Sequence, residues 1–215
     1  MNDKEILRER YKSHWRETKH RATWNRKGII GDSFVEKLLP YLGSEKHLLE
    51  IGTGSGRILK SLMKLYGGGY ASYTGLDISK QNVDSLREQF GDSVHSFILG
   101  DAEEYVFKQK FDVLFSSTTF KHLYPSIDRL LRNVYGAMKP DSVLISDFLE
   151  GEGSFVERSV WTRRYTKDEI TALLDRNGYY VSKLDTVRHK GAPGRGGWRL
   201  LVVSMLKKPR WASVG

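Results

Sequence analysis

Three glycines lying between two acidic residues are the part of this sequence best suited to binding a ligand. The run 50–57, EIGTGSGR, places Glu50 two residues before the first glycine, and Asp77 ends a second apolar segment about 20 residues later. Glycine lets a backbone approach a ligand closely, and an acid at the position of Asp77 can bind ribose hydroxyls. A dinucleotide site needs G-x-G-x-x-G, whereas the spacing here is G-x-G-x-G. The acid ahead of the glycines suits a cationic ligand better than a pyrophosphate.

The elements that must position these residues alternate between strands and helices. Strands are expected at 48–51, 73–76, 93–99, 111–115, 143–148, 180–187 and 200–206. Helices are expected at 3–22, 32–42, 55–66 and 80–90, in a short segment from 102, and at 126–138 and 166–175. Alternation of this kind predicts a parallel sheet covered on both faces, and the last two strands must be antiparallel because no helix connects them. We therefore predict an α/β fold: a doubly wound, mostly parallel, seven-stranded sheet with a terminal antiparallel hairpin, in three α/β/α layers.

Length and composition are those of a single globular domain. The 215 residues include 39% hydrophobic and 28% charged residues, and no run reaches the roughly 20 apolar residues needed to span a bilayer. The chain has no cysteine, so disulfides, thiolate metal sites and cysteine nucleophiles are excluded. The charged N-terminus is unlike a secretory signal, so a cytoplasmic location is expected. The net charge of +9 leaves nucleic acid open as a partner.

The domain boundaries follow from the same pattern. We predict a helical lid at residues 1–30, one main domain at residues 31–208 and a tail at residues 209–215. The first segment carries only a narrow apolar stripe (Ile6, Leu7, Tyr11 and Trp15), so its helix must dock on the domain to persist.

The pattern E-x-G-x-G-x-G, followed by a strand that ends in Asp77, resembles class I S-adenosylmethionine-dependent methyltransferases. The resemblance implies S-adenosylmethionine as cofactor, S-adenosylhomocysteine as product, and no metal. In such an enzyme Asp77 would hold the ribose, Ile78 would pack on the adenine and Asp101 would accept the adenine amino hydrogen. The implied cofactor contacts are Glu50, Gly52, Thr53, Gly54, Gly56, Asp77, Ile78, Asp101, Ala102, Ser116 and Ser117.

The loop after the fourth expected strand indicates the class of acceptor. It reads Ser116-Ser117-Thr118-Thr119 and lacks the Asn/Asp-Pro-Pro-aromatic motif of enzymes that methylate nucleobase amines. The following stretch resembles small-molecule methyltransferases, so we expect transfer to an oxygen or nitrogen of a small molecule. Two alternatives stay open: an RNA or protein methyltransferase that uses the basic surface, and a catalytically silent cofactor-binding partner subunit.

The catalytic and substrate residues are less sharply indicated. His122 is a candidate general base, or a side chain that packs beside the cofactor pocket. Aromatic residues interleaved with arginines can stack on a ring and bind an acid, which suggests an anionic acceptor. The sequence leaves the oligomeric state open. The expected substrate contacts are Trp15, Trp24, Arg163, Arg164, Tyr165, Arg195 and Trp198.

Overall fold

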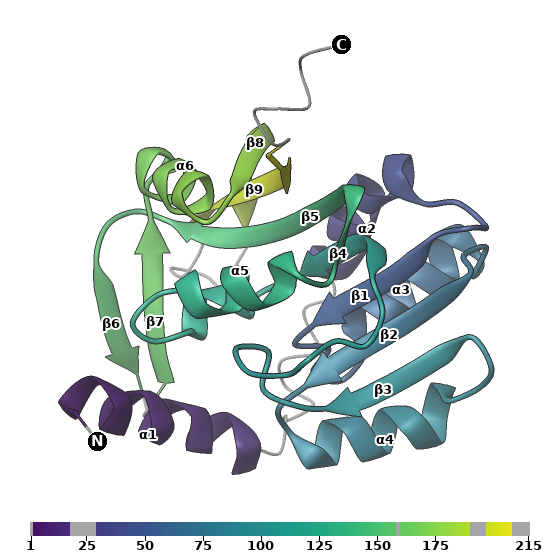
Figure 1. The fold of residues 1–215 in the computed structure, drawn as a ribbon, viewed down its shortest axis with the longest axis horizontal. Helices are drawn as coiled ribbons and strands as arrows, with labels where there is room; N and C mark the ends of the chain where they lie inside the picture. Colours follow the sequence, from purple (N-terminus) through teal and green to yellow (C-terminus); the bar gives the residue numbers. More distant parts are fainter. Residues whose placement is uncertain (1, 18–28, 158–159, 190–196, 208–215) are drawn as a thin grey trace.

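The computed structural model describes residues 2–17, 29–157, 160–189 and 197–207, which form a sheet with helices on both faces (Figure 1). The strand order is β3-β2-β1-β4-β5-β7-β6, with β9 also beside β5 and β8 beside β9. The first five strands are mutually parallel: β1 (His47–Ile51), β2 (Ser72–Asp77), β3 (His95–Leu99), β4 (Phe111–Ser116) and β5 (Met138–Glu150). Neighbours such as Leu48 and Leu49 point to opposite faces and both are fully buried, as expected where helices cover both faces.

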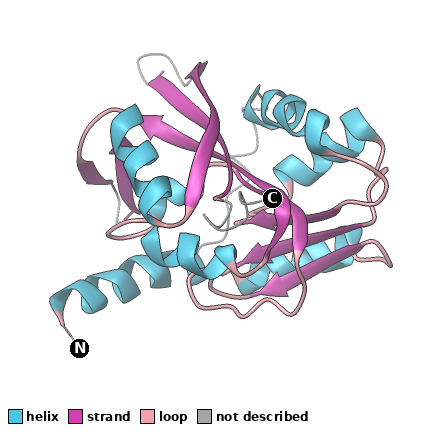
Figure 2. Ribbon diagram, turned by 45° about the horizontal axis from the view of Figure 1, so that its top comes forward, coloured by secondary structure: helices cyan, strands magenta, loops and turns pink. Residues whose placement is uncertain are grey.

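Helices cover both faces of the sheet (Figure 2), and a separate apolar core joins the sheet to the helices on each face. Val35, Leu59 and Leu86 come from the helices of one face, and Leu131 and Leu174 come from those of the other. The first face carries α2 (Ile29–Leu38), α3 (Arg57–Tyr66) and α4 (Lys80–Phe90), and the second carries α5 (Asp128–Tyr135) and α6 (Lys167–Arg176). The predicted α/β/α arrangement is confirmed. The described residues also form two short 3-10 helices, η2 (Leu39–Tyr41) and η3 (Phe120–His122).

The predicted terminal hairpin is present and joins the sheet through β5. It consists of β8 (Tyr179–His189) and β9 (Gly197–Leu206), which are antiparallel to each other. β9 runs antiparallel to β5 from the pair Val143–Met205 to the pair Leu149–Arg199. The first residues of β9 therefore lie at the edge of the sheet where the parallel strands end.

A second hairpin, which the sequence did not predict, brings the sheet to nine strands instead of seven. β6 (Ser154–Glu157) and β7 (Val160–Tyr165) pair antiparallel, and β7 joins the end of β5 in parallel at Leu149 and Glu150. The two adjacent arginines of β7 obscure its apolar pattern. What holds the strand is Tyr165, which is fully buried against Phe148 with the ring centroids 5.3 Å apart.

The short helix predicted from Ala102 is wrong. The residues after β3 form a turn instead, in which the backbone N–H of Tyr105 donates to the carbonyl of Asp101 at 2.8 Å. The Asp101 side chain accepts the backbone N–H of Glu103 at 2.9 Å. Both bonds are those of a capped first helical turn, and the chain leaves this conformation after that one turn.

The N-terminal helix α1 (Asp3–Glu17) lies across the ends of the parallel strands, beside β7 (Figure 1). The sequence predicted that this helix continues to residue 22, but residues 18–22 are outside the described part of the chain. The residues of α1 that are most deeply buried are Arg8 and Lys12, whereas Ile6 of the predicted apolar stripe is about half exposed. The most deeply buried contacts of this helix are therefore made by charged side chains.

The start of α6 provides a test of local structure. Thr166 accepts the backbone N–H of Glu169, and the Glu169 carboxylate accepts the backbone N–H of Thr166. We expect Thr166→Ala to lower the free energy of unfolding by about 1 kcal/mol in a urea titration, because the backbone N–H of Glu169 loses its acceptor, the Thr166 hydroxyl. The matched control is Thr171→Ala in the exposed middle of α6, where alanine has the higher helix propensity and should be neutral or stabilising. Equal losses from both variants would contradict this account.

Candidate active site

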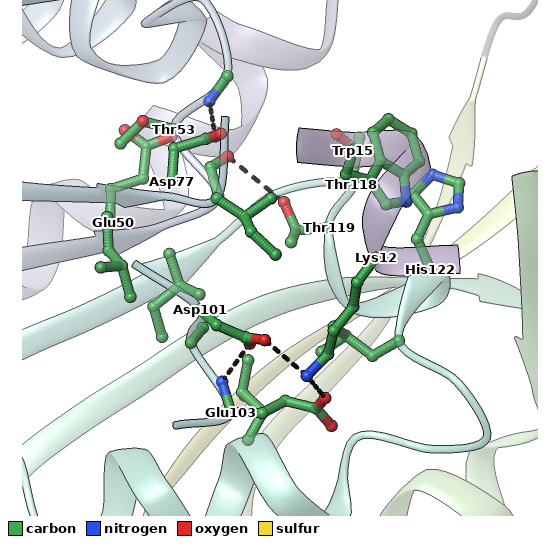
Figure 3. Close-up of a pocket in the computed structure, with 18 of the residues that line it drawn as sticks. Lys12, Trp15, Glu50, Thr53, Asp77, Asp101, Glu103, Thr118, Thr119 and His122 are labelled. Atoms are coloured by element: carbon green, nitrogen blue, oxygen red, sulfur yellow. Dashed lines mark hydrogen bonds and ion pairs between the residues drawn. The ribbon is translucent and has the colours of Figure 1, made fainter. Parts of the chain in front are cut away.

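One pocket lies where β1, β2, β3 and β4 end, and α1 forms its outer wall (Figure 3). β1 and β4 are neighbours in the sheet, but the chain leaves β1 into α3 on one face and leaves β4 toward α5 on the other. Ligands of open α/β sheets bind in the crevice that such a divergence creates. The pocket is lined by Arg8, Tyr11, Lys12, Trp15, Glu50, Ile51, Gly52, Thr53, Gly54, Ser55, Arg57, Ile58, Leu76, Asp77, Ile78, Gly100, Asp101, Ala102, Glu103, Ser117, Thr118, Thr119, His122, Leu123, Tyr124 and Leu130.

The glycine loop forms the floor of the pocket. Gly52 has a φ of 75°, and an added Cβ would lie 2.2 Å from Thr119 Oγ1. Gly56 has a φ of 75° as well, and an added Cβ would lie 2.6 Å from a methyl group of Leu86. Side chains are therefore excluded at both positions for steric reasons. Gly56 itself does not line the pocket: it precedes α3 and allows close packing of that helix.

Asp77 is held rigidly at the end of β2. Its Oδ2 accepts the backbone N–H of Gly54 at 2.7 Å, and its Oδ1 accepts the backbone N–H of Ser79 at 2.8 Å and the amide of Asn82 at 3.2 Å. Carboxylate oxygens have further lone pairs, so both can accept additional hydrogen bonds from a ligand. Ile78 lines the pocket next to it.

Glu50 is a buried carboxyl group beneath the glycine loop. Burial raises its pKa to about 8, although a hydrogen bond from the Tyr73 hydroxyl and the charge of Arg57 act in the opposite direction. The Asp77 carboxylate raises the pKa further. Glu50 is therefore largely uncharged near neutral pH, and a cation bound beside it would favour its ionised form.

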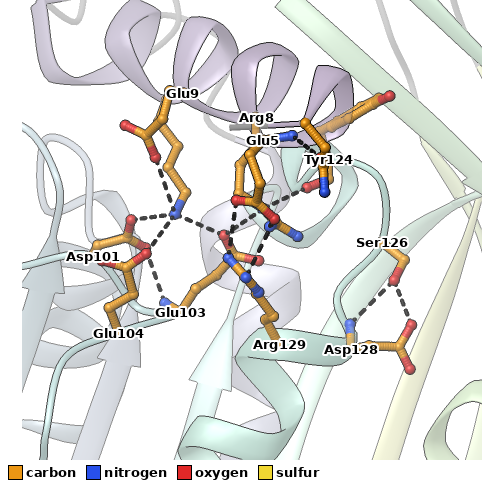
Figure 4. A network of polar contacts seen from close by, with 12 residues as sticks. Glu5, Arg8, Glu9, Asp101, Glu103, Glu104, Tyr124, Ser126, Asp128 and Arg129 are labelled. Carbon is orange, nitrogen blue, oxygen red and sulfur yellow. Dashed lines mark hydrogen bonds and ion pairs between the residues drawn. The ribbon is translucent and has the colours of Figure 1, made fainter.

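A network of ion pairs ties α1 to the loop after β3 (Figure 4). Lys12 Nζ lies 2.5 Å from an Asp101 carboxylate oxygen and 2.9 Å from one of Glu103, and Arg8 Nε lies 3.4 Å from Glu103. Burial alone would lower the pKa of Lys12, but its hydrogen bonds to Asp101 and Glu103 raise it. Arg8 also donates to the carbonyl of Tyr124 at 3.1 Å. Sequence analysis missed Lys12 and Arg8, because their partners are about 90 or more residues away in the chain.

Aromatic side chains form the wall opposite the glycine loop. The Trp15 ring lies 4.7 Å from the His122 ring, and the Tyr11 ring lies 5.2 Å from the Tyr124 ring, measured between centroids. Tyr124 in turn lies 5.3 Å from Trp161. Such a wall suits the face of a planar or apolar group.

His122 is partly buried and weakly basic. Burial lowers its pKa to about 3, and the neighbouring Lys121 charge contributes to the same effect. Its Nδ1 lies 3.0 Å from the carbonyl of Trp161, which can only accept, so Nδ1 carries the proton. A neutral imidazole with so low a pKa is a poor general base at neutral pH.

The two serines after β4 differ in placement. Ser117 lines the pocket. Ser116 does not, because it is buried and its hydroxyl donates to the carbonyl of Ile51 at 2.8 Å, which ties β4 to β1. Of the other predicted cofactor contacts, Glu50, Gly52, Thr53, Gly54, Asp77, Ile78, Asp101 and Ala102 all line the pocket.

The structure does not bring the predicted substrate residues of β7 to the pocket. Arg163 donates to the carbonyl of Pro125 and pairs with Glu169, and Arg164 lies over the Phe155 ring. Tyr165 belongs to the core. The side chains of these β7 residues contact neighbouring loops, strands and the core instead of the pocket. Residue types alone did not reveal this placement.

The remaining predicted substrate contacts divide in two. Trp15 lines the pocket, as described above. Trp24 and Arg195 are outside the described residues, and so is the side chain of Trp198, whose backbone belongs to β9.

No group of three or more histidine, cysteine, aspartate or glutamate side chains in the described ranges is arranged to hold a metal ion. No helix in that part of the chain is long and apolar enough to cross a membrane.

Comparison with known proteins shows that parts of this chain are similar to methyltransferases. The family model for a methyltransferase domain matches residues 49–146. Malonyl-[acyl-carrier protein] O-methyltransferase 1 of Ilyobacter polytropus is 32% identical over 99 residues, which are 45% of this chain and 36% of that protein. Fatty-acid O-methyltransferase of Mycolicibacterium smegmatis is 31% identical over 96 residues, which are 44% of this chain and 34% of that protein. The chain thus matches about a third of the length of these curated relatives.

A solved structure shows the same fold over nearly the whole chain. It is the 1,6-didemethyltoxoflavin-N1-methyltransferase of Burkholderia thailandensis with bound 1,6-didemethyltoxoflavin and S-adenosylhomocysteine. The TM-score is 0.72 at 17% sequence identity, and the match covers 95% of this chain and 88% of that one.

The buried carboxyl group of Glu50 makes a prediction about pH. Its pKa is about 8 in the folded chain and near 4.5 when unfolded, so between these values the folded state keeps a proton that the unfolded state has lost. The free energy of unfolding should therefore fall as pH rises from 4.5 to 8, with a slope contribution of up to about 1.4 kcal/mol per pH unit. Denaturant titrations across this range should show that slope in the wild type and a shallower one in Glu50→Gln. The exposed Glu88→Gln serves as the control, and it should leave the slope unchanged.

Proposed function

Since this chain carries a methyltransferase domain and has the Rossmann-like fold of class I S-adenosylmethionine-dependent methyltransferases, we propose that it transfers a methyl group from S-adenosylmethionine to a small molecule. The observation that carries this proposal is the pocket at the ends of β1 to β4, where Asp77 is fixed by donors from three residues. A carboxylate so restrained loses little freedom when it binds a ribose diol.

The residues of the pocket fit the cofactor's groups one by one. The buried Glu50 suits the ammonium of the methionine part, because that cation favours the ionised carboxyl. Asp77 suits the two ribose hydroxyls, and Ile78 the adenine face. Asp101, which lines the pocket, suits the adenine amino group because a carboxylate oxygen can accept its hydrogen. The glycine loop leaves room for the methionine backbone atoms.

When bound, the cofactor supplies an electrophilic methyl group on a sulfonium. The protein's own contribution is position: the glycine loop and Asp77 hold one reactant, and the aromatic wall of Tyr11, Trp15, His122 and Tyr124 bounds the space for the other. Alignment of two reactants can supply much of the rate enhancement of such a transfer. His122 contributes packing and a fixed hydrogen bond, since its low pKa makes it a weak base.

The acceptor is a small molecule with oxygen or nitrogen as the attacking atom. Two similar curated proteins are named as O-methyltransferases of malonyl-acyl carrier protein and fatty acid, and the similar solved structure is named as an N-methyltransferase. The basic N-terminal segment gives nucleic acid little support, because the described cations Lys12 and Arg16 are already paired with carboxylates. A silent partner subunit has no specific observation in its favour.

The first test of this function is the affinity for S-adenosylhomocysteine measured by calorimetry. We expect Asp77→Asn to weaken binding by about 1–3 kcal/mol, because a charged acceptor of the ribose hydroxyls is lost. Asp84→Asn, an exposed change on α4, is the matched control and should bind normally. Equal affinities of the wild type and Asp77→Asn would refute the assignment of Asp77. Nicotinamide dinucleotides should not bind.

The second test concerns α1 as part of the lid proposed for residues 1–30. Because α1 contributes Tyr11, Lys12 and Trp15 to the pocket wall, S-adenosylhomocysteine should slow amide hydrogen exchange in residues 3–17. Lys12→Met leaves Asp101 and Glu103 without their shared cation and should speed this exchange, whereas the exposed Lys4→Met should not. The lid proposal is wrong if deletion of residues 1–17 leaves the affinity for S-adenosylhomocysteine unchanged.

A further inference from the structure

Two buried cations, Lys121 and Arg199, and a partly buried one, Arg57, gather at one side of the pocket. Arg57 begins α3, Lys121 lies in η3 and Arg199 lies near the start of β9, so they come from three distant parts of the chain. Lys121 and Arg199 are each less than a tenth exposed, and Arg57 lines the pocket itself. None of these charges has a place in the cofactor fit described above.

The carboxylate of Asp147 on β5 lies among these cations, and the largely uncharged carboxyl group of Glu50 lies near Arg57. Asp147 Oδ2 accepts from Arg199 at 2.9 Å and from the Ser117 hydroxyl at 3.3 Å, and Asp147 Oδ1 accepts the backbone N–H of Thr118 at 2.6 Å. Both oxygens of Asp147 thus already bind Arg199 or the loop after β4. Its single negative charge does not neutralise the three positive charges of Arg57, Lys121 and Arg199.

The three cations have too few hydrogen-bond and ion-pair partners among the described residues. Arg57 Nε and Arg199 Nε are buried and have no hydrogen-bond partner there, and Lys121 makes no ion pair with any described carboxylate. Burial lowers the pKa of Lys121 to about 8, and the charge of Arg199 acts in the same direction. Burial also lowers the pKa of Arg57. Buried charge without a counter-ion is costly, so a cluster of this kind is expected to serve a ligand.

The cluster is continuous with the pocket through Thr118. Arg57 Nη2 lies 3.5 Å from the Thr118 hydroxyl, and the Thr118 backbone N–H binds Asp147. Thr118 has a φ of 66°, a conformation that costs a β-branched residue energy and that is found mostly at functional sites. Its neighbours Ser117 and Thr119 line the pocket on either side.

The cofactor does not supply the missing negative charge. It would bring a sulfonium, an ammonium and one carboxylate, and Glu50 would balance the ammonium. The carboxylate and the sulfonium would then cancel in net charge, so the excess of cations over Asp147 would remain at this side of the pocket. The second reactant is the remaining source of an anion.

We propose that Arg57, Lys121 and Arg199 form a subsite for a carboxylate of the methyl acceptor. This inference rests on the proposed methyltransferase function and names its substrate class. Guanidinium groups bind carboxylates in a two-pronged fork, and Lys121 adds a point charge. Cations that surround a carboxylate reduce its nucleophilicity, so the subsite recognises and orients the acceptor while another of its atoms accepts the methyl group. In this proposal the subsite takes the role that the sequence predicted for the β7 arginines, Arg163 and Arg164, which was to bind an anionic acceptor.

The test is calorimetry on protein saturated with S-adenosylhomocysteine. The probes are pairs of a carboxylic acid and its uncharged amide: benzoate with benzamide, 4-hydroxybenzoate with its amide, and octanoate with octanamide. We expect at least one acid to bind about tenfold or more tightly than its amide, because it gains charge-assisted hydrogen bonds. Lys121→Met and Arg199→Gln should each abolish that preference while changing the affinity for S-adenosylhomocysteine by less than about twofold. Lys64→Met, an exposed change on α3, is the control and should keep the preference.

Each other result overturns the inference in a distinguishable way. If no acid binds better than its amide, the subsite does not exist, although the proposed function stands. If Lys121→Met weakens S-adenosylhomocysteine binding as much as it weakens acid binding, the cations serve the cofactor's carboxylate. If the wild-type protein binds no S-adenosylhomocysteine, the proposed function fails, and the inference fails with it. Lys121→Met removes a buried charge and keeps the side-chain volume, so it should fold even if Arg199→Gln does not.

Discussion

The divergence of the chain after β1 and β4 is the constraint on which the rest of the site depends. These strands pair along Leu48–Glu50, yet α3 follows β1 onto one face and α5 follows β4 onto the other. Nothing in the sheet itself can fill the space between the two departing segments. The glycine loop, Asp77 and the loop after β4 all open into that space, and α1 closes it from outside.

Charge balance in a buried setting then decides what each part of the site can bind. Glu50 is a carboxyl group that burial keeps neutral until a cation arrives, whereas Lys12 is a buried cation that two carboxylates keep charged. The cluster of Arg57, Lys121 and Arg199 has an excess of positive charge that Asp147 alone does not offset. In low-dielectric surroundings, each unbalanced charge raises the free energy of the ligand-free protein. It therefore indicates the sign of the charge that a bound ligand would supply.

The docking of α1 shows how a hydrophilic helix can become part of a binding site. An isolated helix of this length and composition would be marginal in water. Arg8 and Lys12 give it long-range partners in the acidic loop after β3, and Tyr11 and Trp15 give it aromatic partners in η3 and β7. The acidic loop thereby serves two roles, since Asp101 holds α1 and faces the pocket.

The sequence by itself determined the features that depend on local pattern. Apolar runs bounded by turns indicated the five parallel strands and the final hairpin, and the glycine spacing with Glu50 and Asp77 indicated where the pocket lies. Only the tertiary structure decided which distant residues meet. The β6–β7 hairpin depends on Tyr165 finding Phe148, and the anchoring of α1 depends on Lys12 meeting a loop about 90 residues further along the chain. The cationic cluster depends on β9 pairing with β5, which sets Arg199 beside Asp147. Contacts of this kind leave no periodic signal in the chain, because they are fixed by the packing of whole elements rather than by the order of neighbouring residues.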